Sequence, residues 1–458
     1  MRRFTMSPVR WSLWLIALMA GLGGSVAAAE YSVHDDQIYL LAQDGELFYP
    51  RVANAGFLLG ADVSSSRRAE VLDRLAAHEI NAIRLGVDDA IAREEPLLNL
   101  QDEDGYIREA ILTRLDALFQ EAARRGLGVI LGLFDFEDVA AQWPDHRWHS
   151  SYGGPCERVR DYFLDNDLQQ DAMRRVEQLA ERYGGAENLL SWELARGANV
   201  FEAFIREDPE IREHVMFWTV LMQDALRQAE PERNLVAISG LPNTFPAQLM
   251  RMPDWFFLQF DSSEMDNGLR SLPGYIQQAR IFKKPVFVAE ADWSGDEDLR
   301  PRYVAHYFWL AMAQSSGLFL SPVEKDGRWS FADAALELAA NHAHFSTRIH
   351  WAGVPRPASR VPIETVPQDA YQIEEVMVGN DRLFWIRRLE PQDAKVQIQL
   401  RTVPGKYEYQ WFDLEGMAIG RSKSFTLNRI DLRMQSPDFH SQIMGRLRLV
   451  ERKTNEPD

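Results

Sequence analysis

Short apolar runs alternate with amphipathic segments from about Asn54 to about Ala352, and this alternation restricts the fold more than any other feature of the chain. The runs are rich in Val, Ile, Leu and Phe, which is typical of parallel strands buried on both faces. The intervening segments Ile107 to Gly126 and Asp167 to Tyr183 have helical periodicity. The expected strands are Gly56 to Val63, Asn81 to Val87, Gly128 to Phe134, Asn188 to Ala195, Asn234 to Gly240, Trp255 to Phe260, Pro285 to Ala289 and Gly317 to Leu320.

Eight β/α units fit this stretch of about 300 residues, close to the roughly 250 of a typical (β/α)8 TIM barrel. A doubly wound open sheet is the alternative, but it requires a phosphate-binding glycine turn after an early strand, which the sequence lacks. We therefore predict an α/β fold with a barrel over residues 30–353. Within that range, Ile38 to Tyr49 predicts a hairpin around Asp44-Gly45 that closes the barrel floor.

Prolines mark the end of the barrel, at Val354 to Pro357 and again from Pro362 to Pro367, and predict a linker over residues 354–370. Short, partly alternating runs over residues 371–458 predict a small C-terminal all-β, sandwich-like domain. Such a domain either binds sugar or packs on the barrel, and the lack of an aromatic row favours packing. The expected strands are Tyr371 to Val378, Leu383 to Leu389, Lys395 to Leu400, Tyr407 to Phe412, Ser424 to Leu427 and Arg446 to Val450.

The first 29 residues have the organisation of a secretory signal peptide. Arg2, Arg3 and Arg10 precede an apolar run of about 12 residues that begins at Trp11, and small residues end at Ala29. This run is shorter than the roughly 20 residues that span a bilayer, and no later segment is long enough. We predict cleavage near Ala29, a periplasmic or secreted location and no stable membrane insertion.

Charge and cysteine content limit the partners and cofactors. Cleavage would remove three arginines and no acidic residue, so the net charge of -18 would become -21. This balance disfavours nucleic acid, anionic membranes and, without a local basic groove, polyanionic substrates.

Cys156 is the only cysteine, so the chain cannot form an internal disulfide. His146 and His149 have no accompanying ligand cluster, and we expect neither a metal nor an organic cofactor.

Several motifs at the expected strand ends resemble those of one enzyme family. Trp192-Glu193-Leu194-Ala195 resembles the strand-4 signature of clan A glycoside hydrolases, especially family 5 mannanases and cellulases, in which Asn-Glu follows. Lys284 to Glu290 resembles the strand-7 signature that ends in the nucleophile, and Asn81 to Arg84 resembles the strand-2 motif whose arginine supports it. Tyr152 to Cys156, followed by Asp161-Tyr162-Phe163, is similar to a strand-3 loop of mannanase-like members.

The resemblance covers roughly residues 38–350 and implies a retaining site in which Glu290 is the nucleophile and Arg84 its support. A retaining enzyme holds two carboxyl groups ~5–5.5 Å apart, one of which protonates the leaving oxygen. Because barrel chemistry collects at strand ends, we favour this role for Glu290 over a structural ion pair with Arg84 that holds strands 2 and 7 in register.

The acid/base position departs from the family, because Arg196-Gly197 replaces Asn-Glu. Strand alternation predicts that Glu193, Ala195 and residue 197 share one side of strand 4. Glycine has no proton to donate, and Glu193 lies about 13 Å further back along the strand. Loss of general acid catalysis typically slows such a reaction by about 10²- to 10⁴-fold.

Other family positions differ too: the strand-3 histidine falls on Phe134, the strand-6 His-x-Tyr on Gln259-Phe260-Asp261, and the strand-8 tryptophan on Leu320 or Ser321. We therefore favour a pseudo-glycosidase that binds a neutral β-linked polysaccharide or oligosaccharide. Aromatic faces stack on sugar rings, although ordinary packing is the alternative for each ring. The candidate substrate-binding residues are Trp143, Trp148, Tyr152, Gln259, Asp261, Trp293 and Trp329.

Two alternative functions remain open. The chain could be an active retaining endo-β-glycosidase, mannanase- or cellulase-like, with Glu290 as nucleophile and a relocated acid. The candidates for that acid are Asp135, Glu137, Asp261 and Glu324. The chain could instead be a structural partner in an envelope polysaccharide assembly.

Overall fold

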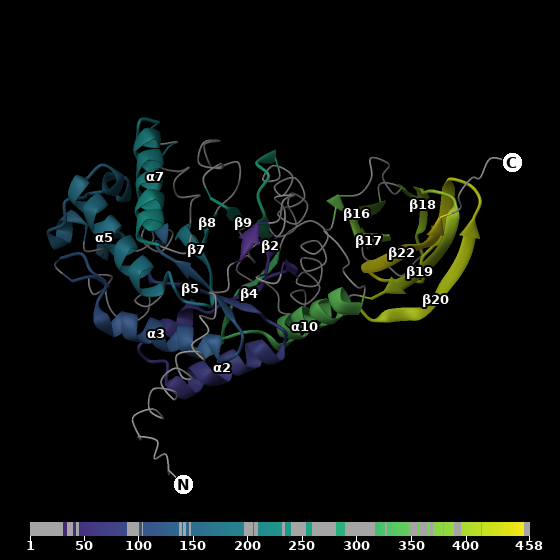
Figure 1. The fold of residues 1–458 in the computed structure, drawn as a ribbon, viewed down its shortest axis with the longest axis horizontal. Coiled ribbons are helices and arrows are strands. Elements are labelled where there is room, and N and C mark those ends of the chain that lie inside the picture. Colours follow the sequence, from purple (N-terminus) through teal and green to yellow (C-terminus); the bar gives the residue numbers. More distant parts are fainter. Residues whose placement is uncertain are drawn as a thin grey trace, which may run out of the picture.

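The computed structural model describes two parts of the chain, an α/β barrel and an all-β sandwich, which lie beside each other (Figure 1). The described residues are 31–33, 40–42, 45–88, 100–102, 104–136, 140, 143–145, 148–196, 205, 209–230, 234–239, 253–258, 281–288, 317–325, 328–348, 356–357, 364–366, 370–378, 380–388, 395–413 and 415–452.

Eight parallel strands close into the barrel in the order β10-β11-β4-β5-β6-β7-β8-β9. Helices α2, α3, α5 and α7 lie outside it and join successive strands (Figure 1). The strands are β4 (Arg51–Asn54), β5 (Ala82–Gly86), β6 (Gly128–Gly132), β7 (Leu189–Ala195), β8 (Leu235–Ser239), β9 (Trp255–Leu258), β10 (Val286–Val288) and β11 (Gly317–Leu320). The helices are α2 (Ser65–Ala77), α3 (Glu109–Ala123), α5 (Asn166–Tyr183), α7 (Ile211–Ala229) and, after β11, α10 (Asp333–Arg348).

Amphipathic helices attach to this sheet because their buried positions recur at helical spacing. On α5, Leu168, Ala172, Val176 and Leu179 are buried. The side chain of Asp165 caps the same helix by accepting hydrogen bonds from the backbone N–H groups of residues 167 and 168, both at 3.0 Å. The parallel sheet and its outer helices follow directly from the two hydrophobic periods of the sequence.

The first barrel strand lies earlier in the chain than predicted. It is β4, whereas the expected strand Gly56 to Val63 begins with a 3-10 turn over Gly56–Leu59. All four residues of that turn are buried, and Arg114 of α3 donates a hydrogen bond of 2.9 Å to the carbonyl of Leu59. A short buried apolar run has the same composition in a strand and in a helical turn, so periodicity did not separate them.

The hairpin before the barrel closes its floor. Strands β2 (Leu40–Leu41) and β3 (Leu47–Phe48) pair antiparallel around Gly45, whose φ of 78° suits glycine. A third strand, β1 (Ser32–Val33), which the sequence did not indicate, pairs with β2. Leu40 packs in one apolar cluster with lumen-facing residues of the barrel, including Val52 and Phe287. The interior of the barrel is therefore a packed core at this end.

The C-terminal part is a sandwich of a six-stranded and a three-stranded sheet, ordered β14-β16-β17-β22-β19-β20 and β15-β18-β21. Phe384, Trp411 and Ile443 of the larger sheet share one core with Ile398 and Leu432 of the smaller. The strands are β14 (Arg356–Pro357), β15 (Glu364–Val366), β16 (Tyr371–Val378), β17 (Asp381–Arg388), β18 (Gln397–Arg401), β19 (Gly405–Phe412), β20 (Ala418–Leu427), β21 (Asp431–Gln435) and β22 (Gln442–Arg452).

Residues 354–370 contribute more than the predicted linker, because β14 and β15 each add an edge strand to one of the two sheets. The other face of the six-stranded sheet is buried as well, at Leu383, Trp385 and Met444. Phe412 of that face meets Phe345 of α10 edge-on, with ring centroids 4.9 Å apart. The sandwich thus packs on the last barrel helix, as the lack of an aromatic row favoured.

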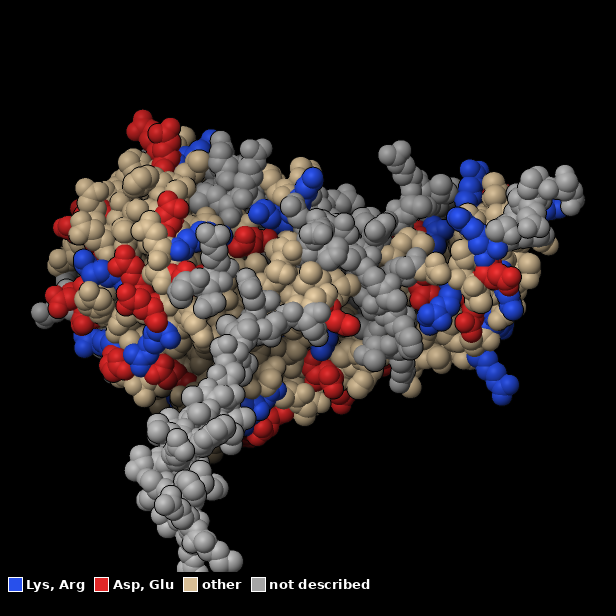
Figure 2. Space-filling model, viewed as in Figure 1, with Lys and Arg blue, Asp and Glu red and all other residues tan. Residues whose placement is uncertain are grey.

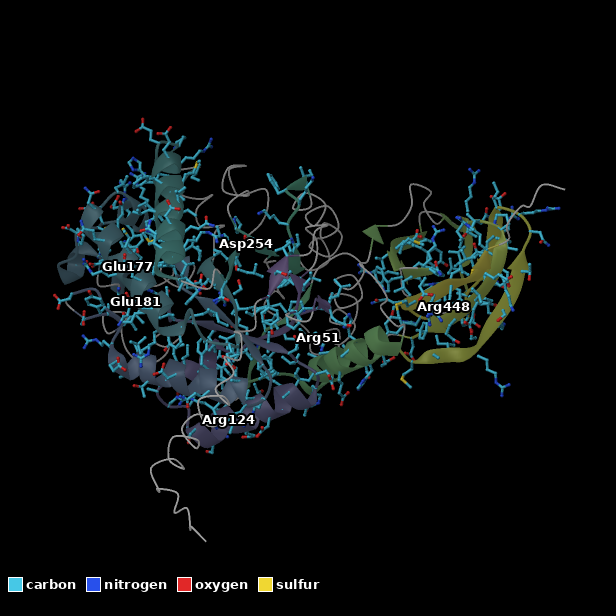
Figure 3. All side chains as sticks on the ribbon, viewed as in Figure 1. Arg51, Arg124, Glu177, Glu181, Asp254 and Arg448 are labelled. Atoms are coloured by element: carbon cyan, nitrogen blue, oxygen red, sulfur yellow. The ribbon has the colours of Figure 1, made fainter. Side chains whose placement is uncertain are left out.

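Acidic charge is concentrated in the barrel part of the chain. Residues 371–458 contain 14 Lys and Arg against 13 Asp and Glu, so the excess of acidic residues lies before them. Figure 2 shows groups of acidic side chains on the barrel, whereas basic side chains are prominent on the sandwich. One of these, Arg448 on β22 (Figure 3), is held by Asp381 at 3.1 Å. No helix within the described ranges is both long and apolar enough to cross a bilayer.

His342 of α10 lies buried next to the first barrel strand, with 2% of its surface exposed. Its ring centroid is 5.2 Å from that of Tyr49. Burial lowers the pKa of His342 to about 3, and the positive charge of Arg51, on β4 (Figure 3), acts in the same direction. The folded protein therefore holds this imidazole neutral across the ordinary pH range.

His342 is expected to make the fold sensitive to acid. The unfolded chain binds a proton at this residue near pH 6.5 but the folded chain only near pH 3, so stability is lost as the pH falls between those values. His342→Phe should flatten the fall of the thermal unfolding midpoint between pH 7 and 4.5, because phenylalanine takes up no proton. His344→Phe, at an exposed position of the same helix, is the control. Equal slopes in wild type and His342→Phe would contradict the prediction.

Candidate functional site

A buried ion pair lies in the interior of the barrel, below its carboxyl-terminal rim. Nε of Arg84, on β5, donates to Oε2 of Glu193, on β7, and Oγ of Ser239, at the end of β8, donates to Oε1. Arg84 is 3% exposed and Glu193 is fully buried. Charge-assisted hydrogen bonds compensate the loss of water around both groups. Three strands of the barrel therefore converge on one carboxylate.

A glycine on the neighbouring strand β6 makes room for that carboxylate. A Cβ built on Gly132, at the end of β6, would lie 3.3 Å from Oε2 of Glu193 and 3.4 Å from Cα of Gly86 on β5. A side chain there would press on the carboxylate and on the adjacent backbone. Gly132 thus lets β6 lie close both to the carboxylate of Glu193 and to the backbone of β5.

A chain of four charged residues forms the rim above the ion pair, where β5, β6 and β7 end. Nη2 of Arg175, on α5, lies 2.9 Å from Oδ1 of Asp88, which follows β5. The other oxygen of Asp88 accepts the backbone N–H of Asp135, after β6, at 2.8 Å. Oδ2 of Asp135 in turn lies 2.9 Å from Nη1 of Arg196, after β7. Two neighbouring aspartates, each paired with one arginine, therefore connect the three strand ends.

Arg196 is the member of this chain that reaches solvent. Its side chain is 21% exposed, whereas the side chains of Asp88, Asp135 and Arg175 are at most 5% exposed. Burial raises the pKa of the Asp88 carboxyl; Arg175 opposes this shift, while the charge of Asp135 adds to it. The inner members form a dehydrated network, and Arg196 is the residue through which this network contacts solvent at the rim.

A register shift in β7 determines which side chain faces the interior at the strand end. Glu193 lies opposite Ala237 of β8, but Ala195 lies opposite Ile238, so β7 has one extra residue between these pairs. Leu194 and Ala195 both pack in the core between sheet and helices. The next residue, Arg196, therefore returns to the side of Glu193. This corrects the prediction from simple alternation for Ala195, which was expected on the side of Glu193; residue 197 lies outside the described residues.

The arginine that the resemblance assigned to nucleophile support has a different described partner. Arg84 pairs with Glu193, the acidic residue of the strand-4 motif. Glu193 does lie below the rim, as predicted from its distance along the strand, and it is inaccessible. Any contact between Arg84 and Glu290 lies outside the described residues.

Phe134, at the family's histidine position, packs outward. Its ring meets that of Trp218, on α7, edge-on with centroids 5.0 Å apart. The guanidinium of Arg175 lies over the Phe134 ring, 4.7 Å from its centre. Phe134 therefore anchors the helical layer and the buried arginine, and it does not line the barrel interior.

Trp143 and Trp148 are buried, which corrects their prediction as sugar platforms. They are 7% and 6% exposed. Trp148 stacks on Tyr162 with centroids 4.4 Å apart, and Nε1 of Trp143 donates to the carbonyl of Glu157 at 2.9 Å. Their ring faces serve the protein core, as the packing alternative held.

Trp329 remains accessible in part. It is half-buried on β13 (Arg328–Ser330), which pairs with β12 (Val323–Lys325) directly after barrel strand β11. Within this hairpin Trp329 lies opposite Glu324, one of the candidate relocated acids. Tyr152 lies in the 3-10 turn Ser150–Tyr152, and only its backbone is described. The remaining predicted site residues lie outside the described residues: Gly197, Gln259, Asp261, Glu290 and Trp293, with Glu137 among the alternative acids.

Sequence reasoning missed Asp88 and Arg175. Asp88 directly follows the predicted strand Asn81 to Val87, and a carboxylate at a barrel strand end is a signal that could have been used. Arg175 gave no such signal, because it lies within the helical period of α5 among buried apolar residues. Its role depends on how deeply α5 packs beside β5.

Comparison with known proteins shows which solved structures share this fold. No family model and no curated protein sequence matches the chain. A solved glycoside hydrolase structure superposes with a TM-score of 0.62 at 11% identity, covering 92% of this chain and 97% of the other. A glycoside hydrolase family 5 structure from Bacteroides vulgatus gives 0.60 at 13% identity, covering 92% and 93%. The chain thus has the fold of glycoside hydrolase family 5 structures, and the similarity extends beyond the barrel.

Breaking the interior ion pair should destabilise the barrel strongly. Glu193→Gln leaves the buried guanidinium of Arg84 without a counter-charge, and we expect a loss of about 3–5 kcal/mol in the free energy of unfolding, measured with denaturant. Glu109→Gln is the matched control, because it breaks the exposed ion pair with Arg182 at 2.8 Å and should cost far less. Similar losses in the two variants would show that Glu193 does not organise the interior.

Proposed function

We propose that this protein binds a neutral β-linked polysaccharide at the carboxyl-terminal rim of the barrel and lacks the usual proton donor of a retaining glycosidase. The observation that carries the proposal is the ion pair of Arg196 with Asp135 at the end of β7. This is the strand end at which the fold's hydrolases, by the motif resemblance, carry their acid/base. Here the interior-facing group is a guanidinium.

The chemistry of that group supports binding over hydrolysis. A retaining mechanism requires a carboxyl group that gives its proton to the leaving oxygen. Arginine stays protonated in proteins and cannot exchange a proton in this way. Asp135, the carboxylate beside it, is 4% exposed and is held on the guanidinium at 2.9 Å. An oxygen so engaged is directed at Arg196 and not at a bound sugar.

The same pair suits a neutral sugar. A guanidinium group is planar and supplies hydrogen-bond donors that match hydroxyl groups in a pocket, and Arg196 is the partly exposed member of the pair. The pair carries no net charge, so a neutral ligand can bind beside it without leaving an unbalanced charge buried. The acidic barrel acts in the same direction, because it repels polyanions.

We also propose that the protein works after export, in the periplasm or outside the cell, on the basis of residues 1–29.

Calorimetric titration with cellohexaose and mannohexaose tests the binding. We expect saturable binding to one of them, and Arg196→Ala should weaken it by about 10- to 100-fold, the loss of a hydrogen bond to a charged group. Arg182→Ala, at an exposed ion-pair network on α5, should bind as wild type does. Absence of binding to either oligosaccharide and to their polymers would refute the proposal.

Incubation of the same oligosaccharides with the protein tests the missing proton donor. Chromatography of the products should show no new reducing ends after prolonged incubation. Hydrolysis that Glu290→Gln abolishes would establish the active-enzyme alternative instead, with a proton donor elsewhere on the rim. Hydrolysis that survives Glu290→Gln would remove Glu290 as the nucleophile.

A further inference from the structure

Asp135 makes with Arg196 the kind of contact that the carboxylate of an acidic sugar makes with a guanidinium group. Guanidinium groups recognise carboxylates through paired, charge-assisted hydrogen bonds. At the end of β7 that interaction is already made within the protein, between Oδ2 of Asp135 and Nη1 of Arg196 at 2.9 Å. The side chain of Asp135 thus acts as an internal counterpart of a uronate carboxylate.

The four charged residues that connect the ends of β5, β6 and β7 balance one another. Arg175 and Arg196 are balanced by Asp88 and Asp135, and Arg84 is balanced by Glu193 in the layer below. A uronate carboxylate entering here would give up its water without finding an unbalanced cation, and it would approach the charge of Asp135. A neutral sugar incurs neither cost. The arrangement therefore selects against acidic glycans.

The backbone fixes the two side chains beside each other independently of the ion pair. The N–H of Arg196 donates to the carbonyl of Phe134 at 2.8 Å, and the N–H of Phe136 donates to the carbonyl of Arg196 at 3.1 Å. The N–H of Asp135 is bound to Asp88. Replacing the Asp135 carboxylate by an amide keeps all three backbone bonds, so Arg196 stays at the rim.

We propose that Asp135 determines the glycan class: it neutralises Arg196 and so restricts the rim to neutral sugars. This inference rests on the proposed binding function. Removal of the Asp135 charge leaves a partly exposed cation at the rim, and uronate-containing oligosaccharides become ligands. Asp135 is a specificity-determining residue that acts through Arg196.

The test compares wild type and Asp135→Asn by calorimetry at about 0.15 M salt, with mannohexaose, cellohexaose and a β-linked hexamer of mannuronate. Wild type should bind the better neutral hexamer at least tenfold more tightly than the mannuronate hexamer. Asp135→Asn should gain at least tenfold for the mannuronate hexamer, and the gain should shrink as salt is raised. The double variant Asp135→Asn/Arg196→Gln should lose it.

A second variant separates this local effect from the change in total charge. Asp73→Asn also removes one carboxylate from an arginine, Arg125, but at an exposed site on α2, and it should give no gain. If wild type binds the neutral hexamer and folded Asp135→Asn shows no gain, the inference fails while the proposed function stands. If wild type binds the mannuronate hexamer as tightly as the neutral ones, the inference fails without any variant. If no hexamer binds either protein, both proposals fail.

Discussion

Glu193 carries its carboxylate inside a closed barrel, where water cannot solvate it. Arg84 and Ser239 replace that water, and the strands that carry them are thereby held at one level around the carboxylate. Gly132 completes the arrangement by leaving room where a side chain would press on the carboxylate and on the backbone of Gly86. Because this interaction sets the depth of β7, the next interior-facing residue on that strand arrives at the rim.

Charged groups at the rim are also removed from water and need partners. There they form a longer series of contacts. Arg175 reaches in from the helical layer to Asp88, and the carboxylate of Asp88 then holds the backbone of Asp135. Asp135 can consequently present its own carboxylate to Arg196. This series of contacts ends on a cation, Arg196, at the end of β7, so the charges buried beside the barrel strands and the exposed charge of the rim belong to one network.

Much of the fold follows from hydrophobic periodicity. Barrel strands from β5 onward, helices α3 and α5, and most sandwich strands lie where their runs predict them, because each buries apolar residues at its own spacing. Prediction failed where composition is ambiguous: the turn Gly56–Leu59 has the apolar content of a strand, and the proline-containing β14 was expected to be linker. At the site, Trp143 and Trp148 were candidates for sugar stacking with ordinary packing as the alternative, and the structure buries both; loop position alone does not reveal which rings pack in the core.

The sequence by itself determined the alternation of strands and helices, the lack of a disulfide and the replacement of Asn-Glu by Arg196-Gly197, because these depend only on the identity and order of residues. The tertiary structure decided that Arg196 turns to the interior side and meets Asp135. One extra residue in β7 relative to β8 reverses the alternation at the strand end, and such a shift arises from pairing with neighbouring strands. The ion pair follows because β6 and β7 lie side by side in the closed sheet.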